Sequence, residues 1–243
     1  QIVDKADKSG KIPKGRQVIF ANTPSYVGSH VTGFANMVKG MAMLAQPTGK
    51  RNGKVNITPG WVEPADMEEI KRLCALIGVK VTMFPDTSGV LNGPLSGEFK
   101  MFPEGGATMD DLRAAGDSVG TLALGEWCSA DAARFLDTNC KVPCRVLEMP
   151  FGLKATDRFV DALRVIAGAG VPEEINHERG QLVDMISDMH QYFYRRSVAL
   201  AGDPDQLIAM TEFLVSIDMW PRHLVTGTPG KAFEDRIREL TAD

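Results

Sequence analysis

Short apolar runs alternate along this chain with longer segments whose apolar residues recur at helical spacing. The expected strands cover residues 18–21, 55–58, 79–84, 120–124, 145–149, 197–200 and 224–226. Turns of Gly, Pro, Asn, Asp, Ser and Thr follow these runs and separate them from the helical segments. Repeated strand–helix units build parallel sheets that helices cover. The sequence therefore predicts an α/β fold with parallel sheets.

Two units of this kind are expected. We predict a Rossmann-like domain over residues 1–170, a linking helix over 171–196, and the start of a further Rossmann-like domain over 197–243. The last region has only two expected strands, which are too few to bury a parallel sheet on both faces. We therefore expect the second domain to be incomplete and the chain to be truncated at both ends.

Composition and charge exclude several classes of protein. The chain has 243 residues, of which 44% are hydrophobic and 24% charged, and its net charge is -4. This composition is typical of a soluble globular protein. Basic residues are scattered, so we expect no nucleic-acid partner. An apolar run of 18 residues is lacking and the start is polar and lysine-rich, so we expect no membrane partner and a cytoplasmic location.

The segment 20–33 is the most informative candidate site. A short apolar run leads into a turn of small polar residues, and a helix is expected from about residue 32. Open α/β sheets place ligands at the carboxyl ends of their strands. The hydroxyls of Thr23, Ser25 and Ser29 can hydrogen-bond or ligate a hard metal. On local chemistry alone, a plain turn with a capping residue explains the same pattern.

The four cysteines, Cys74, Cys128, Cys140 and Cys144, form no recognisable metal motif. Cys140 and Cys144 are separated by three residues, which fits neither a thioredoxin motif nor a zinc knuckle. Cys74 lies among apolar residues at helical spacing, which favours a core position. We therefore expect these cysteines to be structural.

Local signals also predict helix ends and one long loop. Pro64 is expected to open a helix and Gly78 to end it. Thr108 with Asp111 resembles a capping box, and Ser129 and Thr156 are expected to cap two further helices. A long helix over about 176–194 should carry an apolar line, namely Leu182, Ile186, Met189 and Phe193. Residues 85–107 are rich in Gly and Pro and predict a long surface excursion.

Four segments together resemble a known family, the β-subunit of nitrogenase component 1. They are residues 20–33, 55–60, 178–184 and 202–205, and their order and spacing fit across nearly the whole chain. At a finer level, other positions resemble most the iron-only alternative nitrogenase. These positions are Tyr26 and residues 84–91, 103–106 and 225–230.

The resemblance implies three Rossmann-like domains per subunit, of which this chain covers the second and the start of the third. It implies a role in reducing dinitrogen to ammonia, with an [8Fe-7S] P-cluster shared with an α-subunit. In the family, the serine of the Thr-Pro-Ser turn binds one iron of the oxidised P-cluster, so the resemblance implies that role for Ser25. His30 lies just beyond the turn, where either a hydrogen bond near the cluster or a structural hydrogen bond is possible.

The same resemblance implies partners. A separate iron protein hydrolyses ATP and delivers electrons, and alternative systems add a small δ-subunit. No Walker A sequence occurs in this chain, consistent with ATP being bound only by the partner. The thiolates that hold the P-cluster belong to the part of the β-subunit that precedes this segment. The chain is therefore not expected to be catalytic alone.

Other interpretations remain open at this stage. Nitrogenase-like reductases, such as methylthio-alkane and dark protochlorophyllide reductases, share the architecture, as do cofactor-assembly scaffolds. A non-redox, two-lobe ligand-binding module would instead need a cleft with convergent polar groups. A purely structural segment that scaffolds a partner is a third possibility.

Overall fold

A four-stranded parallel sheet forms the centre of the first unit. The structure is a computed structural model that describes residues 5–6, 8–13 and 16–242. The sheet consists of β1 (Val55–Thr58), β2 (Val81–Met83), β3 (Gly120–Leu124) and β4 (Cys144–Leu147), in the order β2-β1-β3-β4. β1 is buried along its whole length, its polar Asn56 and Thr58 included, as expected for a central parallel strand that is covered on both faces. The α/β fold predicted from the sequence is confirmed.

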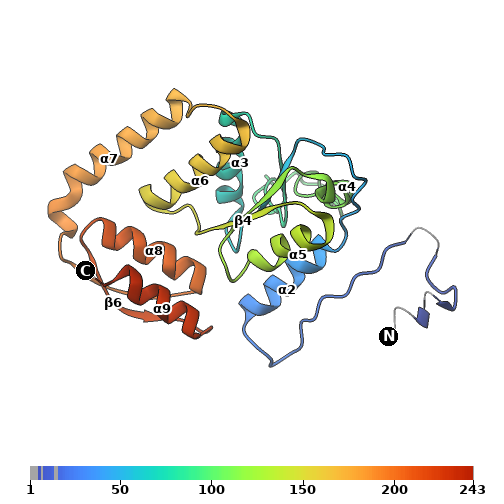
Figure 1. Cartoon of the computed structure of the whole chain (residues 1–243). Coiled ribbons are helices and arrows are strands. Elements are labelled where there is room, and N and C mark those ends of the chain that lie inside the picture. The colour runs from blue at the N-terminus through green and yellow to red at the C-terminus, as the bar shows by residue number, and fades with distance from the viewer. Residues whose placement is uncertain (1–4, 7, 14–15, 243) are drawn as a thin grey trace.

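Helices cover both faces of this sheet (Figure 1). On one face lie α3 (Pro64–Ile77) and α6 (Gly152–Ala167), and on the other lie α2 (His30–Ala42), α4 (Met109–Ala114) and α5 (Ala130–Cys140). A short 3-10 helix, η1 (Ala115–Asp117), follows α4. Each helical layer packs an apolar core against the strands. The first core is centred on Ile57, Leu122 and Phe159, and the second on Val38, Phe84 and Leu136.

A second, smaller sheet follows a long helix. α7 (Glu173–Phe193) leads to β5 (Ser197–Ala201), α8 (Pro204–Ser216), β6 (Trp220–Val225) and α9 (Lys231–Leu240), and β5 pairs in parallel with β6. The domain boundaries at 170 and 197 stay a prediction. The predicted domains also include some residues that lie outside the described part of the chain, namely 1–4, 7, 14–15 and 243.

Several predicted helix ends are confirmed by their local contacts. Pro64 occupies the first turn of α3, and Gly78 ends this helix in the left-handed conformation with φ 85°. The capping box at α4 is present, because the Thr108 hydroxyl accepts from the Asp111 N–H at 3.1 Å. The hydroxyl of Ser129 makes no capping bond although Ser129 is the N-cap of α5.

Two predictions are wrong. Residues 18–21 are not a strand, because this extended stretch is part of an arm that runs past α2 without joining a ladder (Figure 1). Thr156 does not cap α6, because the helix already begins at Gly152 and the Thr156 hydroxyl donates to the Pro150 carbonyl at 3.2 Å. The long helix is confirmed as α7, and Ile175 is the one buried residue described in it, so its predicted apolar line lies largely at the surface.

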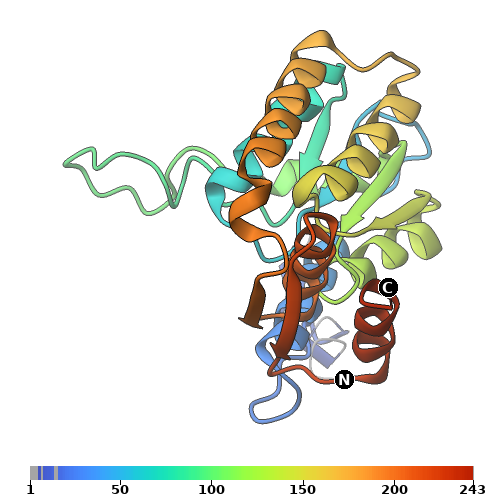
Figure 2. The same ribbon diagram turned by 90° about the vertical axis from the view of Figure 1, so that its left-hand side faces the viewer.

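The excursion over residues 85–107 is confirmed. Within the described chain, neither a helix nor a strand lies between β2 and α4. Figure 2 shows this segment in green, extending away from the body of the molecule. The large apolar residues that it exposes are Leu91, Leu95, Phe99, Met101 and Phe102. Among the described residues, no helix is both long and apolar enough to cross a bilayer.

Candidate functional site

The turn that carries Ser25 ends at the start of α2. Ser29 is the N-cap of α2, and its hydroxyl accepts a hydrogen bond from the Thr32 N–H at 3.4 Å. The Asn36 side chain donates to the Asn22 carbonyl at 2.7 Å and so ties the beginning of the turn back to the helix. These contacts explain Ser29 as a capping residue, one of the roles that the sequence allowed.

Ser25 itself lies on the surface of the molecule. Its neighbours are also exposed, and Tyr26 is 106% exposed and has a φ of 60°. Phe20 and Val27 expose 71% and 66% of their surface. A hollow of about 250 Å³ lies beside the turn, but Ser25 is not among its described lining residues. Such a group of exposed aromatic and apolar side chains is typical of a surface that another molecule covers.

The His30 side chain is held by contacts with Asp203 and Trp61. Its Nε2 lies 2.9 and 3.0 Å from the two carboxylate oxygens of Asp203, the N-cap of α8. The imidazole also packs edge-on against the ring of Trp61, with centroids 5.3 Å apart. Of the two roles left open for His30, the structure gives it a structural hydrogen bond.

The four cysteines do not form a cluster site. Cys74 and Cys128 are buried, and burial raises the pKa of each thiol to about 12. Burial also raises the pKa of Cys140 and Cys144, which are half-buried. Among the described residues, no group of three His, Cys, Asp or Glu side chains is placed to hold a metal ion. Because thiolates are the metal-binding form, these raised pKa values favour structural cysteines.

The possible ligand atoms of this chain fit a peripheral ligand of a P-cluster, not the set of thiolates that would hold it. The chain offers an exposed, hard oxygen donor at Ser25 and no gathered thiolates in the described part. An oxygen donor of this kind can add a single bond to a cluster that thiolates from elsewhere hold. The residues present fit a peripheral ligand, not the main holder of the group.

The switch point of the first sheet is filled by the chain itself. The chain passes from β1 to β2 on one side and then to β3 on the other, and ligands of open α/β sheets bind at such a point. The backbone N–H groups of Glu126, Trp127 and Cys128 instead donate to the carboxylate of Asp205, at 2.7–3.2 Å. Burial raises the pKa of Asp205, while these N–H bonds act in the opposite direction.

Sequence reasoning missed Asp205 as a docking group. In the sequence, the run 202–205 stands out only as one of the four segments that carry the family resemblance, and the available signal is an Asp in the first turn of a helix. In the structure this carboxylate joins α8 of the second unit to the turn after β3. A side chain of the protein itself thus occupies the switch point. The two-lobe ligand-binding module therefore lacks a free binding site at the place where such sheets usually bind ligands.

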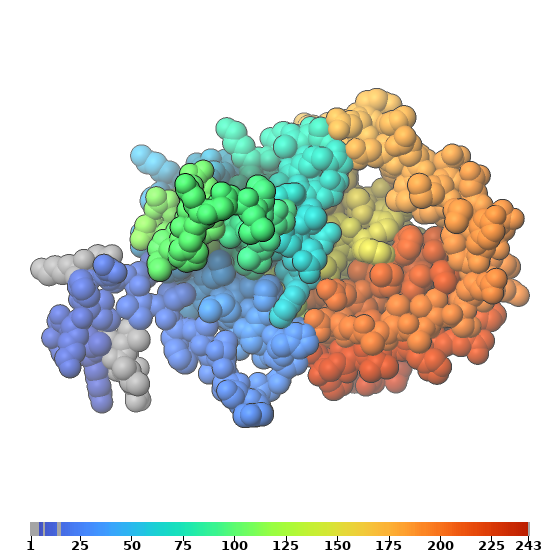
Figure 3. All heavy atoms as spheres, turned by 180° about the vertical axis from the view of Figure 1, so that it is seen from behind, coloured from blue at the N-terminus to red at the C-terminus, as the bar shows by residue number. Residues whose placement is uncertain are grey.

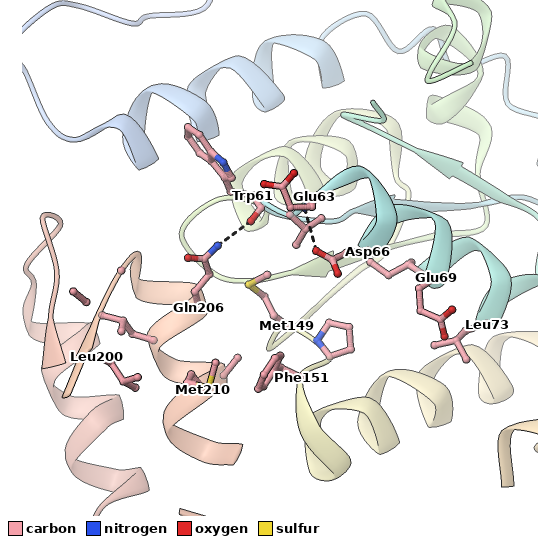
Figure 4. Close-up of a pocket in the computed structure, with 17 residues that line it drawn as sticks. Trp61, Glu63, Asp66, Glu69, Leu73, Met149, Phe151, Leu200, Gln206 and Met210 are labelled. Carbon is pink, nitrogen blue, oxygen red and sulfur yellow. Dashed lines mark hydrogen bonds between the residues drawn. The ribbon is translucent and has the colours of Figure 1, made fainter. Parts of the chain in front are cut away.

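A larger hollow separates α3 from the second unit (Figures 3 and 4). Its volume is about 510 Å³, and its lining is mainly apolar, with Leu73, Met149 and Phe151 facing Leu200 and Met210. In Figure 3 it opens between the cyan α3 and the orange second unit. Two of the carboxylates at its rim already have partners. Asp66 accepts from the Glu63 N–H, and Glu69 pairs with Arg72.

Sequence comparison decides the family. Residues 1–243 match the family model described as Nitrogenase component 1 type Oxidoreductase. The chain belongs to this family.

Two relatives of this component 1 chain are nitrogenase β chains of different metal type. It is 49% identical over 242 residues to the nitrogenase molybdenum-iron protein beta chain of Clostridium pasteurianum, covering 99% of this chain and 53% of that one. It is 34% identical over 227 residues to the nitrogenase vanadium-iron protein beta chain of Trichormus variabilis, covering 92% and 49%. The solved structure "Nitrogenase Cp1 at pH 6.5" superimposes with a TM-score of 0.94 at 49% identity, over 99% of this chain and 53% of that one.

These similarities confirm the β-subunit family and the component 1 fold, and they limit the finer assignment. The component 1 chain spans about half the length of the curated relatives it matches. The relatives named above are of molybdenum-iron and vanadium-iron type, so they do not support the predicted iron-only subtype.

Proposed function

We propose that this chain is a segment of a nitrogenase component 1 β-subunit of molybdenum-iron type, acting in the reduction of dinitrogen to ammonia. Support comes from the family match over the whole chain and from the 49% identity to a molybdenum-iron beta chain. The proposed partners are an α-subunit and a separate, ATP-hydrolysing iron protein. A small δ-subunit was expected with the iron-only type, which the relatives do not support.

One observation carries the proposed role of this segment. The turn with Ser25 is exposed together with three large side chains, in a chain of the family whose members share a P-cluster between two subunits. We infer that the α-subunit and the rest of the β-subunit cover this surface, and that an [8Fe-7S] P-cluster lies against it. When bound there, the cluster would supply a relay for electrons.

Within that arrangement, the residues of this chain have distinct tasks. Ser25 would hold an oxygen donor in reach of one iron, and an alkoxide there stabilises the more oxidised state because it is a hard ligand. Phe20, Tyr26 and Val27 would exclude water once they are covered, which strengthens electrostatic interactions at the turn. Ser29 and Asn36 keep the turn attached to α2.

The replacement Ser25→Ala tests this role in the full complex. We expect the electron paramagnetic resonance signals of the oxidised P-cluster to change and those of the reduced state to stay. The potential of the affected couple should become more positive, because the oxidised state loses its hard ligand. Redox titration followed by resonance spectroscopy measures both effects.

Thr23→Val is the matched control, because it removes an exposed hydroxyl two positions before Ser25 in the same turn and keeps the shape of the side chain. It should change stability by no more than about 0.5 kcal/mol and leave both spectra unchanged. Unchanged spectra for Ser25→Ala in both redox states would remove Ser25 from the ligand set. Molybdenum analysis of the purified complex tests the metal type independently.

A further inference from the structure

Segments from three parts of the sequence meet at the beginning of α2. His30 contacts both carboxylate oxygens of Asp203 at 2.9 and 3.0 Å, although 173 positions separate the two residues. Trp61, which follows β1, packs against the His30 imidazole, and its carbonyl accepts a hydrogen bond from the Gln206 side chain at 3.2 Å. We call His30, Trp61, Asp203 and Gln206 the α2–α8 latch.

The turn that carries Ser25 is otherwise fastened only to α2 among the contacts described. The Asn36 side chain holds the Asn22 carbonyl, and the Ser29 hydroxyl accepts from Thr32, and both donors belong to α2. The position of the turn relative to the rest of the protein therefore depends on the position of the first turn of α2. His30 is the first residue of α2, so the latch acts at that point.

We propose that Asp203 is a positioning residue for the turn. Acting through His30, it fixes the start of α2 against α8 and thereby holds Ser25 in place. The Asp203 side chain is 17% exposed and that of His30 is 55% exposed, so the carboxylate is the better-fixed member of the pair. A ligand held in place before the reaction avoids the cost of ordering it later. The functional consequence rests on the proposed role of Ser25, whereas the mechanical coupling does not.

Hydrogen–deuterium exchange in the full complex tests the mechanical part. Asp203→Ala should speed amide exchange in the peptide 20–36 by roughly three- to tenfold, the range expected when a charge-assisted but partly exposed hydrogen bond is lost. Asp203→Asn keeps a favourable N-cap and one oxygen acceptor, so its effect should be smaller and the fold should be preserved. His30→Gln keeps an N–H donor and should likewise show a smaller effect than Asp203→Ala.

A second His–Asp contact provides the matched control. His190 Nε2 lies 2.9 Å from Asp218, a contact that links α7 to the turn before β6 and does not involve α2. Asp218→Ala should leave exchange in the peptide 20–36 unchanged. Equal exchange in wild type and Asp203→Ala would overturn the latch, and so would an equal increase in Asp218→Ala.

Redox titration of the same complexes tests the consequence for Ser25. If Asp203 acts through the turn, Asp203→Ala should shift the potential of the oxidised couple in the direction of Ser25→Ala. In the double variant, Asp203→Ala should then add no further shift to that of Ser25→Ala, because the effects of two substitutions that act through one contact are not additive. A full additional shift in the double variant would overturn the positioning role.

Failure of the proposed ligand can be separated from failure of the latch. If Ser25→Ala leaves the spectra unchanged while Asp203→Ala speeds exchange, the ligand role is wrong and the latch stands as a structural coupling. If Ser25→Ala changes the spectra while Asp203→Ala changes neither exchange nor potential, the ligand role stands and the latch is wrong.

Discussion

Gly125 and Asp205 show at the residue scale how the two units are joined. Gly125 follows β3 with a φ of +102°, and a Cβ built there would lie 2.6 Å from the Asp205 carboxylate. The carboxylate can reach the N–H groups of the three residues that follow only because Gly125 has no side chain on this side of the backbone. A glycine is thus required at 125 for both its conformation and its size.

Gly125→Ala should destabilise the protein by about 2–4 kcal/mol, because it combines backbone strain with a clash against a buried carboxylate. Chemical denaturation of the purified protein measures this loss. Gly168→Ala is the control, since Gly168 has a φ of +62° and nothing within 4 Å of the added Cβ. It should cost only about 1 kcal/mol. Equal losses for the two variants would mean that Asp205 is not tightly docked.

At the scale of elements, a charged network joins α6 to the second unit. The Arg158 guanidinium of α6 contacts Glu212 of α8 at 2.6 and 3.0 Å and Glu148, which follows β4, at 2.8 Å. Arg236 of α9 contacts the other oxygen of Glu148. The Glu212 side chain is only 10% exposed, and Arg158 is its described ion-pair partner.

Arg158→Met should lower the free energy of unfolding by about 1–2 kcal/mol, because it leaves Glu212 without its main partner; partial exposure of the arginine limits the loss. Arg164→Met is the control on the same helix, as Arg164 pairs only with the exposed Asp161 one turn earlier in the described contacts. That change should cost no more than about 0.5 kcal/mol. Denaturation curves compare the two, and a larger loss for Arg164→Met would contradict the network's importance.

On the scale of the whole molecule, apolar side chains are exposed in three separate regions. They lie on the turn beside Ser25, on the excursion 85–107 and along α7. In α7, the predicted apolar line includes Leu182 and Met189, which are 37% and 46% exposed. Exposed apolar surface of this extent is typical of a protein that functions inside a larger assembly.

The 243-residue chain, produced by itself, should retain no stoichiometric iron or sulfide after anaerobic reconstitution and desalting. The reason is that its described part offers no thiolate cluster, and one serine oxygen cannot hold an [8Fe-7S] group. It should also bind a hydrophobic dye more strongly than the complete complex does. Chemical analysis and dye fluorescence measure these properties, and stoichiometric iron with sulfide in the isolated chain would contradict the peripheral role of this segment.

The sequence by itself determined the features that depend on near neighbours. The ends of α3 at Pro64 and Gly78, the capping box at Thr108 and the excursion 85–107 were predictable, because caps and turns involve residues a few positions apart. The relation to the β-subunit family was also readable, since its motifs are local stretches of sequence.

Only the tertiary structure decided the contacts between distant residues. Residues 18–21 have the composition of a strand, yet a strand exists only where a neighbour completes its ladder. Asp205 reaches the Cys128 N–H across 77 positions, and His30 reaches Asp203 across 173. No local signal encodes such pairs, because the topology of the sheets determines which turns and helix ends meet.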